Sequence, residues 1–156
     1  MTIELELREC PALAELPDEH LAIIAGFARH EEIGEGELLT ASGEPADRFF
    51  VVRRGRFFVE IPAAGVGRLL IDSAGPHQIV GWSWLSPPYR WHFDTRAAEP
   101  GLVVAVDAAA TRDAMEADHH VGYSMLRCFS ALAIDRLLHT RLRLLDVTAA
   151  PRQDAP

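Results

Sequence analysis

The sequence predicts a mainly β domain: an antiparallel β-roll or jelly roll with a short N-terminal helix and two C-terminal helices. The main observation is a series of short apolar runs over residues 31–107, separated by Gly and Pro turns and without helical patterns between them. The second is a helical periodicity on either side, over residues 18–29 and 108–147. With 156 residues, 49% of them hydrophobic and 24% charged, the chain is expected to form one domain over residues 1–148.

The N-terminal helix is expected to begin after Pro17. Asp18 and Glu19 would occupy its first turn, where the helix dipole favours acidic side chains. Apolar residues then recur at helical spacing, at Leu21, Ile24 and Phe27. The helix is therefore predicted to cover about residues 18–29.

The roll is expected to consist of short strands in quick succession. Apolar or alternating runs occur at residues 33–39, 49–52, 56–61, 68–72, 78–81, 94–98 and 101–107. Turn sequences that contain Gly and Pro join them, at residues 43–47, 62–65, 75–76 and 99–101. Because no helix lies between the strands, a sandwich, barrel or jelly roll is favoured.

Two helices are predicted at the C-terminal end. The first opens with the alanine run at 108–110 and is interrupted near residues 118–120, and the second runs from about Val121 to Asp146. Apolar residues of the second helix recur at steps of three, four and six, at Val121, Met125, Phe129, Leu132, Leu138, Leu142 and Leu145. Leu137 and Leu144 add a second stripe, which is more than packing on a small barrel requires. Residues 149–156 are expected to form a flexible tail.

Composition narrows the functional classes. A net charge of −8 and a pI near 5.3 weigh against nucleic-acid binding, which usually requires a basic surface. The two cysteines, Cys10 and Cys128, suggest neither a disulfide framework nor a metal-ligand spacing, and both are expected to be inert structural thiols. The N-terminus lacks the pattern of a signal peptide, and no apolar run approaches the roughly 20 residues that span a bilayer. A cytoplasmic protein without membrane or nucleic-acid partners is expected.

The most unusual segment is an aromatic run within residues 81–96. It holds all three tryptophans together with a Pro-Pro pair and three further polar or aromatic residues: Trp82, Trp84, Trp91, Tyr89, Arg90 and His92. Flat apolar rings beside a guanidinium group suit a ligand that has both apolar area and an oxyanion. We expect this segment to meet a ligand or a partner and to fold inward against the barrel.

A set of motifs in the first half of the roll resembles the cyclic nucleotide-binding domain. This is the sensor domain of bacterial catabolite-activator and redox-regulator families and of cyclic-nucleotide-dependent kinases and channels. The motifs are Gly34-Glu35, Leu38-Leu39, Gly43-Glu44-Pro45-Ala46-Asp47, Phe49, Val51-Val52 and Gly55. Their glycine spacing is typical of tight turns between short roll strands. The resemblance covers about residues 13–147 and implies a helix, a β-roll and two further helices, with a sensory function.

The aromatic run departs from the ligand-binding cassette of that family. In the family, a Gly-Glu pair opens a short helix whose backbone N–H groups, with an Arg, hold the cyclic phosphate, while the Glu binds the ribose hydroxyl. Gly81 matches this glycine, but Trp82 replaces the Glu, and its indole N–H can only donate. Aligning Arg96-Ala97 with the family's trailing Arg-Ala places Trp91 at the phosphate-binding Arg and His92 at the Ser/Thr position. Arg90 lies one residue before the position of the family's phosphate-binding Arg.

The candidate ligand-binding residues of this cassette are Gly81, Trp82, Ser83, Trp84, Arg90, Trp91 and His92. Arg90 is either a clamp for an anion near the amides of residues 81–85 or a surface arginine stacked on Trp91 or Tyr89. The indoles of the first two tryptophans either pack on a ligand or partner, or fill the pocket that relatives leave open. His92 is either a residue that titrates or binds an anion, or a hydrogen-bonded structural histidine.

The resemblance also implies that the long C-terminal helix dimerises and supplies a lid, with Arg136 and Thr140 as lid candidates. A second interpretation covers its basic residues, which would form a solvated face near the helix C-terminus: Arg127, Arg136, Arg141 and Arg143. His119-His120 is not expected to hold a metal, because adjacent side chains point apart.

Three functions remain open. The first is a non-enzymatic sensor of a cyclic nucleotide or another small anion, without a cofactor, which forms a homodimer through the long helix and signals through an unidentified protein partner. With few residues after Val147, no helix-turn-helix module is expected. The second is a degenerate receptor that binds no nucleotide and serves as an interaction subunit. The third is a metal-dependent jelly-roll enzyme, but His77 and His92 are isolated and no catalytic motif occurs. No catalytic or metal-binding residue is therefore predicted.

Overall fold

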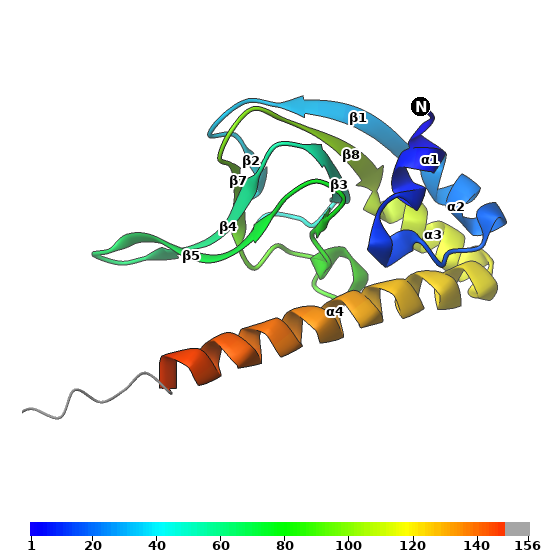
Figure 1. The fold of residues 1–156 in the computed structure, drawn as a ribbon. Helices are drawn as coiled ribbons and strands as arrows, with labels where there is room; N and C mark the ends of the chain where they lie inside the picture. The colour runs from blue at the N-terminus through cyan, green and yellow to red at the C-terminus, as the bar shows by residue number, and fades with distance from the viewer. Residues whose placement is uncertain (149–156) are drawn as a thin grey trace, which may run out of the picture.

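A computed structural model describes residues 1–148, in which eight antiparallel strands form two four-stranded sheets (Figure 1). The first sheet has the order β1 (Ala28–Ile33), β8 (Gly101–Asp107), β3 (Arg48–Arg54), β6 (Ile79–Val80). The second has the order β2 (Leu38–Thr40), β7 (Asp94–Ala97), β4 (Phe57–Ala63), β5 (Gly67–Ala74). The predicted mainly β fold, a roll with an N-terminal helix and C-terminal helices, is confirmed.

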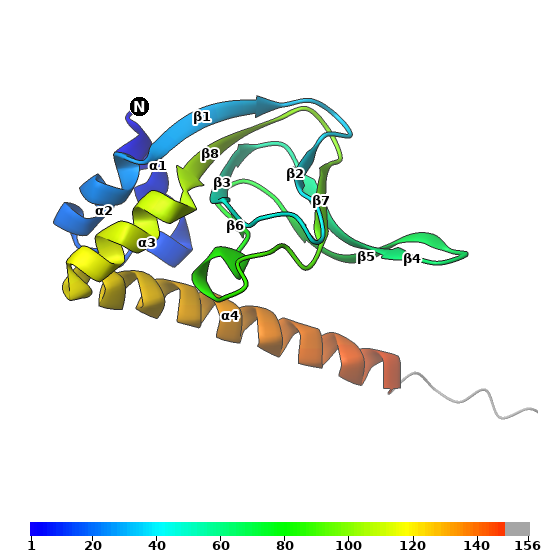
Figure 2. The ribbon, with the colours of Figure 1, turned by 180° about the vertical axis from the view of Figure 1, so that it is seen from behind.

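Helices close one end of the roll (Figure 2). Helices α1 (Ile3–Arg8) and α2 (Asp18–Ala25) flank the 3₁₀ turn η1 (Pro11–Leu13). Strand β8 leads directly into α3 (Ala108–Ala117), and the long α4 (His119–Thr148) then runs beneath the roll and projects beyond it. The predicted tail at 149–156 lies outside the described residues.

One core joins the roll to the helices. Its largest buried side chains come from the N-terminal segment, the strands, the cassette and α4: Leu7, Leu13, Leu16, Leu21, Ile24, Phe49, Phe50, Val51, Val52, Phe57, Trp84 and Met125. Because the helical and strand residues share this core, α4 cannot leave the roll at its N-terminal half without exposing apolar surface to water.

The N-terminal helix is shorter than predicted. Helix α2 ends at Ala25, and residues 28 and 29 lie in β1 instead of the helix predicted over 18–29. Ala28 lies opposite Val106 of β8, so the strand pairing overrides the local helical spacing and the roll begins three residues before its predicted start at residue 31.

One local feature was missed. Helix α1 was not predicted, although Thr2 caps it through a hydrogen bond from the amide of Leu5 to the Thr2 hydroxyl (3.3 Å) and Leu7 is buried. Residues 33–39, expected to belong to short strands broken by Gly turns, contain the end of β1, a turn and the start of β2. The turn is closed by a hydrogen bond from the amide of Glu37 to the carbonyl of Gly34 (3.1 Å).

The turn between β3 and β4 depends on a close approach of two backbone segments. Gly55 has a φ of +92°, and a Cβ at this position would lie 2.8 Å from the Cα of Gly101 and 3.0 Å from the carbonyl oxygen of Pro100. The backbone of residue 101 cannot move away easily, because Gly101 pairs with Ile33 of β1 and the next residue, Leu102, pairs with Arg54 of β3. Gly55 is therefore required by conformation and by space.

Gly55→Ala is expected to destabilise the domain by roughly 2–4 kcal/mol, because a left-handed backbone strain adds to a backbone clash. Gly65→Ala is the matched control, since Gly65 also has a positive φ (+77°) but nothing lies within 4 Å of the Cβ that the substitution would add. Urea denaturation of both variants measures the difference. Equal losses of stability would show that the approach to residue 101 carries no cost.

Candidate functional site

The candidate site lies in the loop from Gly81 to Phe93, which joins β6 to β7 and faces α4 (Figure 2). In place of the family's short helix, this loop contains the single 3₁₀ turn η2 (Ser83–Leu85). Ser83 is half-buried in this turn. The loop folds inward: two of its three indoles are buried, and the third packs beside α4.

Trp84 is fully buried between the roll and α4. Its ring stacks on Phe49 at 5.0 Å between centroids and meets Phe129 of α4 edge-on at 5.2 Å. Its carbonyl accepts a hydrogen bond from Arg112 of α3 (2.8 Å), whereas its Nε1–H has no hydrogen-bond partner within the described part of the chain. Trp84 thus fixes the loop to the core.

Trp91 occupies the space above Gly81. A Cβ on Gly81 would lie 2.6 Å from Cη2 and 2.7 Å from Cζ3 of the Trp91 ring, and the ring is only 7% exposed. The backbone of Trp91 is held on both sides, because its amide donates to the carbonyl of Glu44 (2.9 Å) and its carbonyl accepts from the amide of Gly43 (2.8 Å). The indole is therefore locked in place.

Arg90 and His92 lie on the outer side of the loop. The Nη1 of Arg90 donates to the carbonyl of Gly43 (2.8 Å), and the side chain is exposed. No aromatic stacking of Arg90 is observed within residues 1–148; the guanidinium that stacks on Tyr89 belongs to Arg112, at 4.2 Å. The exposed His92 contributes its carbonyl oxygen, which accepts from the Ser42 hydroxyl (3.2 Å).

Trp82 is the exposed indole of the loop, with 37% of its surface accessible. It borders a shallow apolar notch of about 230 Å³ against α4, which we call the α4 notch; its lining residues are Trp82, Leu85, Leu126, Phe129, Ser130 and Ala133. The guanidinium carbon of Arg136 lies 5.9 Å from the ring centroid of Trp82. The notch therefore offers an aromatic edge beside a cation.

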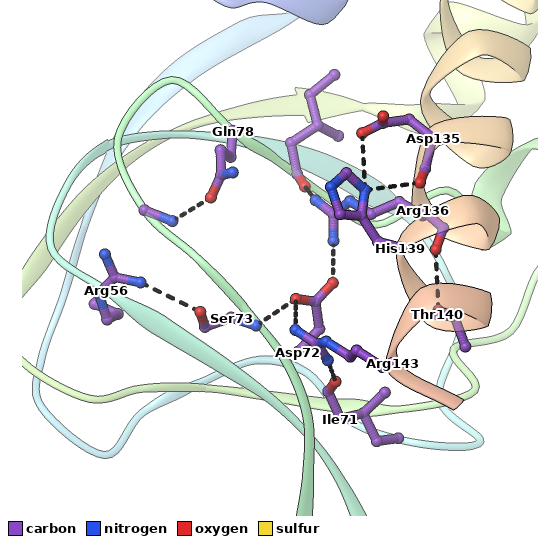
Figure 3. Close-up of polar contacts among 12 residues, drawn as sticks. Arg56, Ile71, Asp72, Ser73, Gln78, Asp135, Arg136, His139, Thr140 and Arg143 are labelled. Atoms are coloured by element: carbon purple, nitrogen blue, oxygen red, sulfur yellow. Dashed lines mark hydrogen bonds and ion pairs between the residues drawn. The ribbon is translucent and has the colours of Figure 1, made fainter. Parts of the chain in front are cut away.

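Two arginines of α4 converge on one carboxylate of β5, and we call this contact the Asp72 latch (Figure 3). Arg136 donates from Nη1 to Asp72 Oδ2 (2.7 Å) and from Nη2 to the carbonyl of Ile79 (3.1 Å). Arg143 places Nη2 3.5 Å from Asp72 Oδ1 and donates from Nη1 to the carbonyl of Ile71. Thr140, between them in the sequence, bonds to the carbonyl of Arg136 in its own helix (2.9 Å).

Sequence patterns do not predict Asp72 as part of the site, and they favour a solvated face for Arg136 and Arg143. That interpretation is wrong for Arg136, whose side chain is 22% exposed and paired with Asp72. The spacing of the two arginines could have indicated a shared partner, because residues seven apart lie on one helix face. The role of Asp72 as their partner could not be predicted, because a charged residue near a strand end is usually solvated.

The described residues were also compared with the requirements of a metal site and of a membrane-spanning helix. Within residues 1–148, no group of three or more His, Cys, Asp or Glu side chains is arranged to hold a metal ion. Over the same residues, no helix has the length and apolar character needed to cross a bilayer.

The family model of the cyclic nucleotide-binding domain matches residues 30–118. The chain belongs to this family. A solved domain of the family from Methylobacillus flagellatus superposes with a TM-score of 0.81 at 14% identity, covering 97% of this chain and 89% of that one. A Geobacter metallireducens protein named for cyclic nucleotide binding gives 0.78 at 25% identity, covering 88% and 99%. The regulatory domain of Toxoplasma gondii protein kinase A, solved with cyclic AMP, gives 0.71 at 15% identity, covering 85% and 49%.

Curated relatives are much longer than this chain. Uncharacterised NTE family proteins of Mycobacterium bovis and Mycobacterium tuberculosis are 28% identical over 128 residues, which is 81% of this chain and 21% of each relative. The chain therefore spans about a fifth of the length of the curated relatives it matches. Cyclic nucleotide-binding domains are in general regulatory and not catalytic, and this chain has their fold.

Asp72→Asn is expected to loosen the distal half of α4, because both arginines lose their ionic partner. Partly exposed pairs contribute up to about 1 kcal/mol, so amide exchange beyond Arg136 should accelerate by roughly 3- to 6-fold in hydrogen-exchange mass spectrometry. Asp135→Asn is the control, since Asp135 pairs only with His139 of its own helix among the described residues (3.6 Å). Unchanged exchange in the Asp72 variant would show that the latch does not hold the helix.

Proposed function

We propose that this domain is a non-catalytic regulatory module that acts through protein contacts. Its own Trp91 fills the space above Gly81 in which the family resemblance places the nucleotide phosphate, and we call this space the phosphate seat. The observation that carries the proposal is the indole of Trp91 in direct contact with Gly81. By the family resemblance, the amides that follow this glycine are the groups that hold the cyclic phosphate. A buried ring and a phosphate cannot occupy one volume.

The charge needed for a phosphate is also missing from the seat. Trp91 stands where the family has its arginine, and the neighbouring Arg90 turns outward to the carbonyl of Gly43. Trp82 stands where the family has the ribose-binding Glu, and it packs at the α4 notch. An indole cannot accept hydrogen bonds from ribose hydroxyls, so two of the family's interactions lack their chemistry here.

A second candidate function is a sensor of a different small anion, and Arg90 supports it. Its guanidinium is exposed and, of its N–H groups, Nη1 alone has a described partner, the Gly43 carbonyl. A guanidinium with free donors can bind a carboxylate or phosphate in a bidentate manner. This function predicts an anion outside the roll, beside residues 43 and 90, and leaves the Trp91 seat closed.

The output of the module is proposed to pass through a homodimer along α4. Ile134, Leu138, Leu142 and Leu145 recur at steps of three and four and are all exposed. They lie on the helix face opposite Arg136 and Arg143, which point to the roll, so the stripe faces away from the domain. An apolar stripe on one face of a projecting helix is typical of a helix that packs on a second helix. We propose that the domain works in the cytoplasm, as members of its family usually do.

Cyclic AMP and cyclic GMP are expected to leave the Tm of the wild-type protein unchanged in differential scanning fluorimetry. The double variant Trp82→Glu/Trp91→Arg vacates the seat and restores two family contacts, so it should gain nucleotide-dependent stabilisation. A nucleotide at 100 times its Kd adds about 2.7 kcal/mol, or roughly 5–10 °C for a domain of this size. Trp82→Glu/Trp91→Ala is the matched control, which opens the space without the arginine.

Nucleotide-dependent stabilisation of the wild-type protein would overturn the closed-seat proposal. If Arg90→Ala abolished that stabilisation, or stabilisation by inorganic phosphate, the sensor function would replace it. Circular dichroism of each variant confirms that the comparison is made between folded proteins.

Leu138→Glu is expected to convert a dimer to a monomer in sedimentation equilibrium, because it buries a charge in an apolar helix contact. The dimer Kd should rise by roughly 100-fold or more. Leu5→Glu, on α1, is the control: Leu5 and Leu138 are 57% and 54% exposed. A wild-type protein that sediments as a monomer would exclude this interface.

A further inference from the structure

A second concavity lies on the other flank of α4, between the N-terminal segment and the turn that precedes β6. We call it the N-terminal groove. It has a volume of about 910 Å³, and residues of the segments 10–17 and 77–79 form two of its walls. One face of α4 forms the third, with Tyr123, Arg127, Cys128, Ala131, Asp135 and Arg136. It shares no residue with the α4 notch, so it is separate from the cassette.

The fold places the only two cysteines of the chain on the wall of this groove. Cys10 and Cys128 are 118 positions apart (128 − 10), yet both line its wall. Cys10 is fully buried at the start of η1, and Cys128 is half-buried on α4. Their distance in the sequence favours two unrelated structural thiols, whereas the fold brings them into one cavity.

The helix face that carries Cys128 is turned toward the N-terminal segment. One turn before it, Ser124 Oγ lies 2.8 Å from Nδ1 of His20 in α2. One turn after it, Leu132 lines the same groove as Ala12 of η1. Because residues four apart share a helix face, Cys128 points to the segment that begins with Cys10.

We propose that Cys10 and Cys128 are a reversible disulfide pair that joins η1 to α4 when a low-molecular-weight disulfide is present. The Cys128 thiolate attacks one sulfur of the small disulfide, forms a mixed disulfide and displaces one small thiolate. The Cys10 thiolate then attacks Sγ of Cys128 and displaces the second small thiolate. The two protein thiol protons pass to the two thiolates released, so the protein pair is oxidised and the small disulfide is reduced.

The surroundings of the two sulfurs decide how fast the bond forms. Burial raises the pKa of Cys10, against the opposing effects of the amides of Ala12 and Leu13 and of Arg53. Burial, with Glu15 and the Cys10 thiol, raises the pKa of Cys128, and Arg127 opposes this. The other charged or titratable groups of the groove are His77, Asp135 and Arg136, together with Tyr123. Formation is therefore slow near neutral pH and accelerates as the pH rises.

The same surroundings favour the oxidised state once it is made. A disulfide is readily reduced when the thiolates released from it are stabilised, and burial has the opposite effect on this pair. The bond would close a loop over residues 10–128, which restricts the unfolded chain strongly. It would also fix the start of α4 to the N-terminal segment, independently of any ligand at the cassette.

The test uses the reduced, full-length protein incubated with oxidised glutathione at neutral and alkaline pH. Intact mass is expected to fall by two hydrogen atoms, and peptide mapping is expected to link Cys10 to Cys128, with a rate that increases up to about tenfold per pH unit below the thiol pKa values. The Tm of the oxidised protein should rise by roughly 10 °C or more and return after treatment with dithiothreitol.

Cys128→Ser is the principal variant, because a half-buried thiol on a helix tolerates this change better than the fully buried Cys10. It should show neither the loss of mass nor the rise in Tm, while circular dichroism shows that it is folded. A wild-type protein that retains glutathione on Cys128, forms a disulfide between two chains, or stays reduced at alkaline pH would overturn the proposal.

Discussion

The contact of Trp84 with Phe49 and Phe129 is the constraint on which the rest of the site depends. It joins β3, the cassette turn η2 and α4 through ring centroids 5.0 to 5.2 Å apart. Since aromatic rings bury large apolar areas and pack in defined geometries, none of the three elements can shift without the others. The cassette and the long helix therefore behave as one unit, and the placement of Trp91 and Trp82 follows from it.

Within that unit, aromatic packing and an ion pair occupy the positions where the family resemblance places the ligand-binding groups. Trp91 covers Gly81, and Arg136, a lid candidate by the resemblance, pairs with Asp72 of β5. The domain thus has the architecture of a cyclic nucleotide-binding domain, and we propose that its own side chains occupy the place that the family resemblance assigns to a ligand. This arrangement is consistent with a regulatory module whose active conformation is set by its fold and by its partners.

The architecture could be predicted because glycine and proline turns punctuate the roll, and helical periodicity returns after Asp107. The beginning of β1 could not, because Ala28 and Arg29 pair with β8 from a distance of more than 70 positions in sequence. In the cassette, the departure of Trp82 and Trp91 from the family pattern was visible in the sequence. The contact of Trp91 with Gly81, the Asp72 latch and the placement of the two cysteines in one groove depend on tertiary packing, which local patterns do not encode.

The Asp72 latch also gives α4 the properties of a lever. Arg136 and Arg143 reach one carboxylate from positions two turns apart, so a rotation of the helix about its axis would strain both contacts together. Beyond Arg136 the helix continues for about 18 Å to Thr148, at 1.5 Å per residue. A tilt of about 10° around the carboxylate would displace that end by about 3 Å. A small conformational change in the roll would therefore produce a larger displacement at the end of α4, where it could alter the contacts of a bound protein.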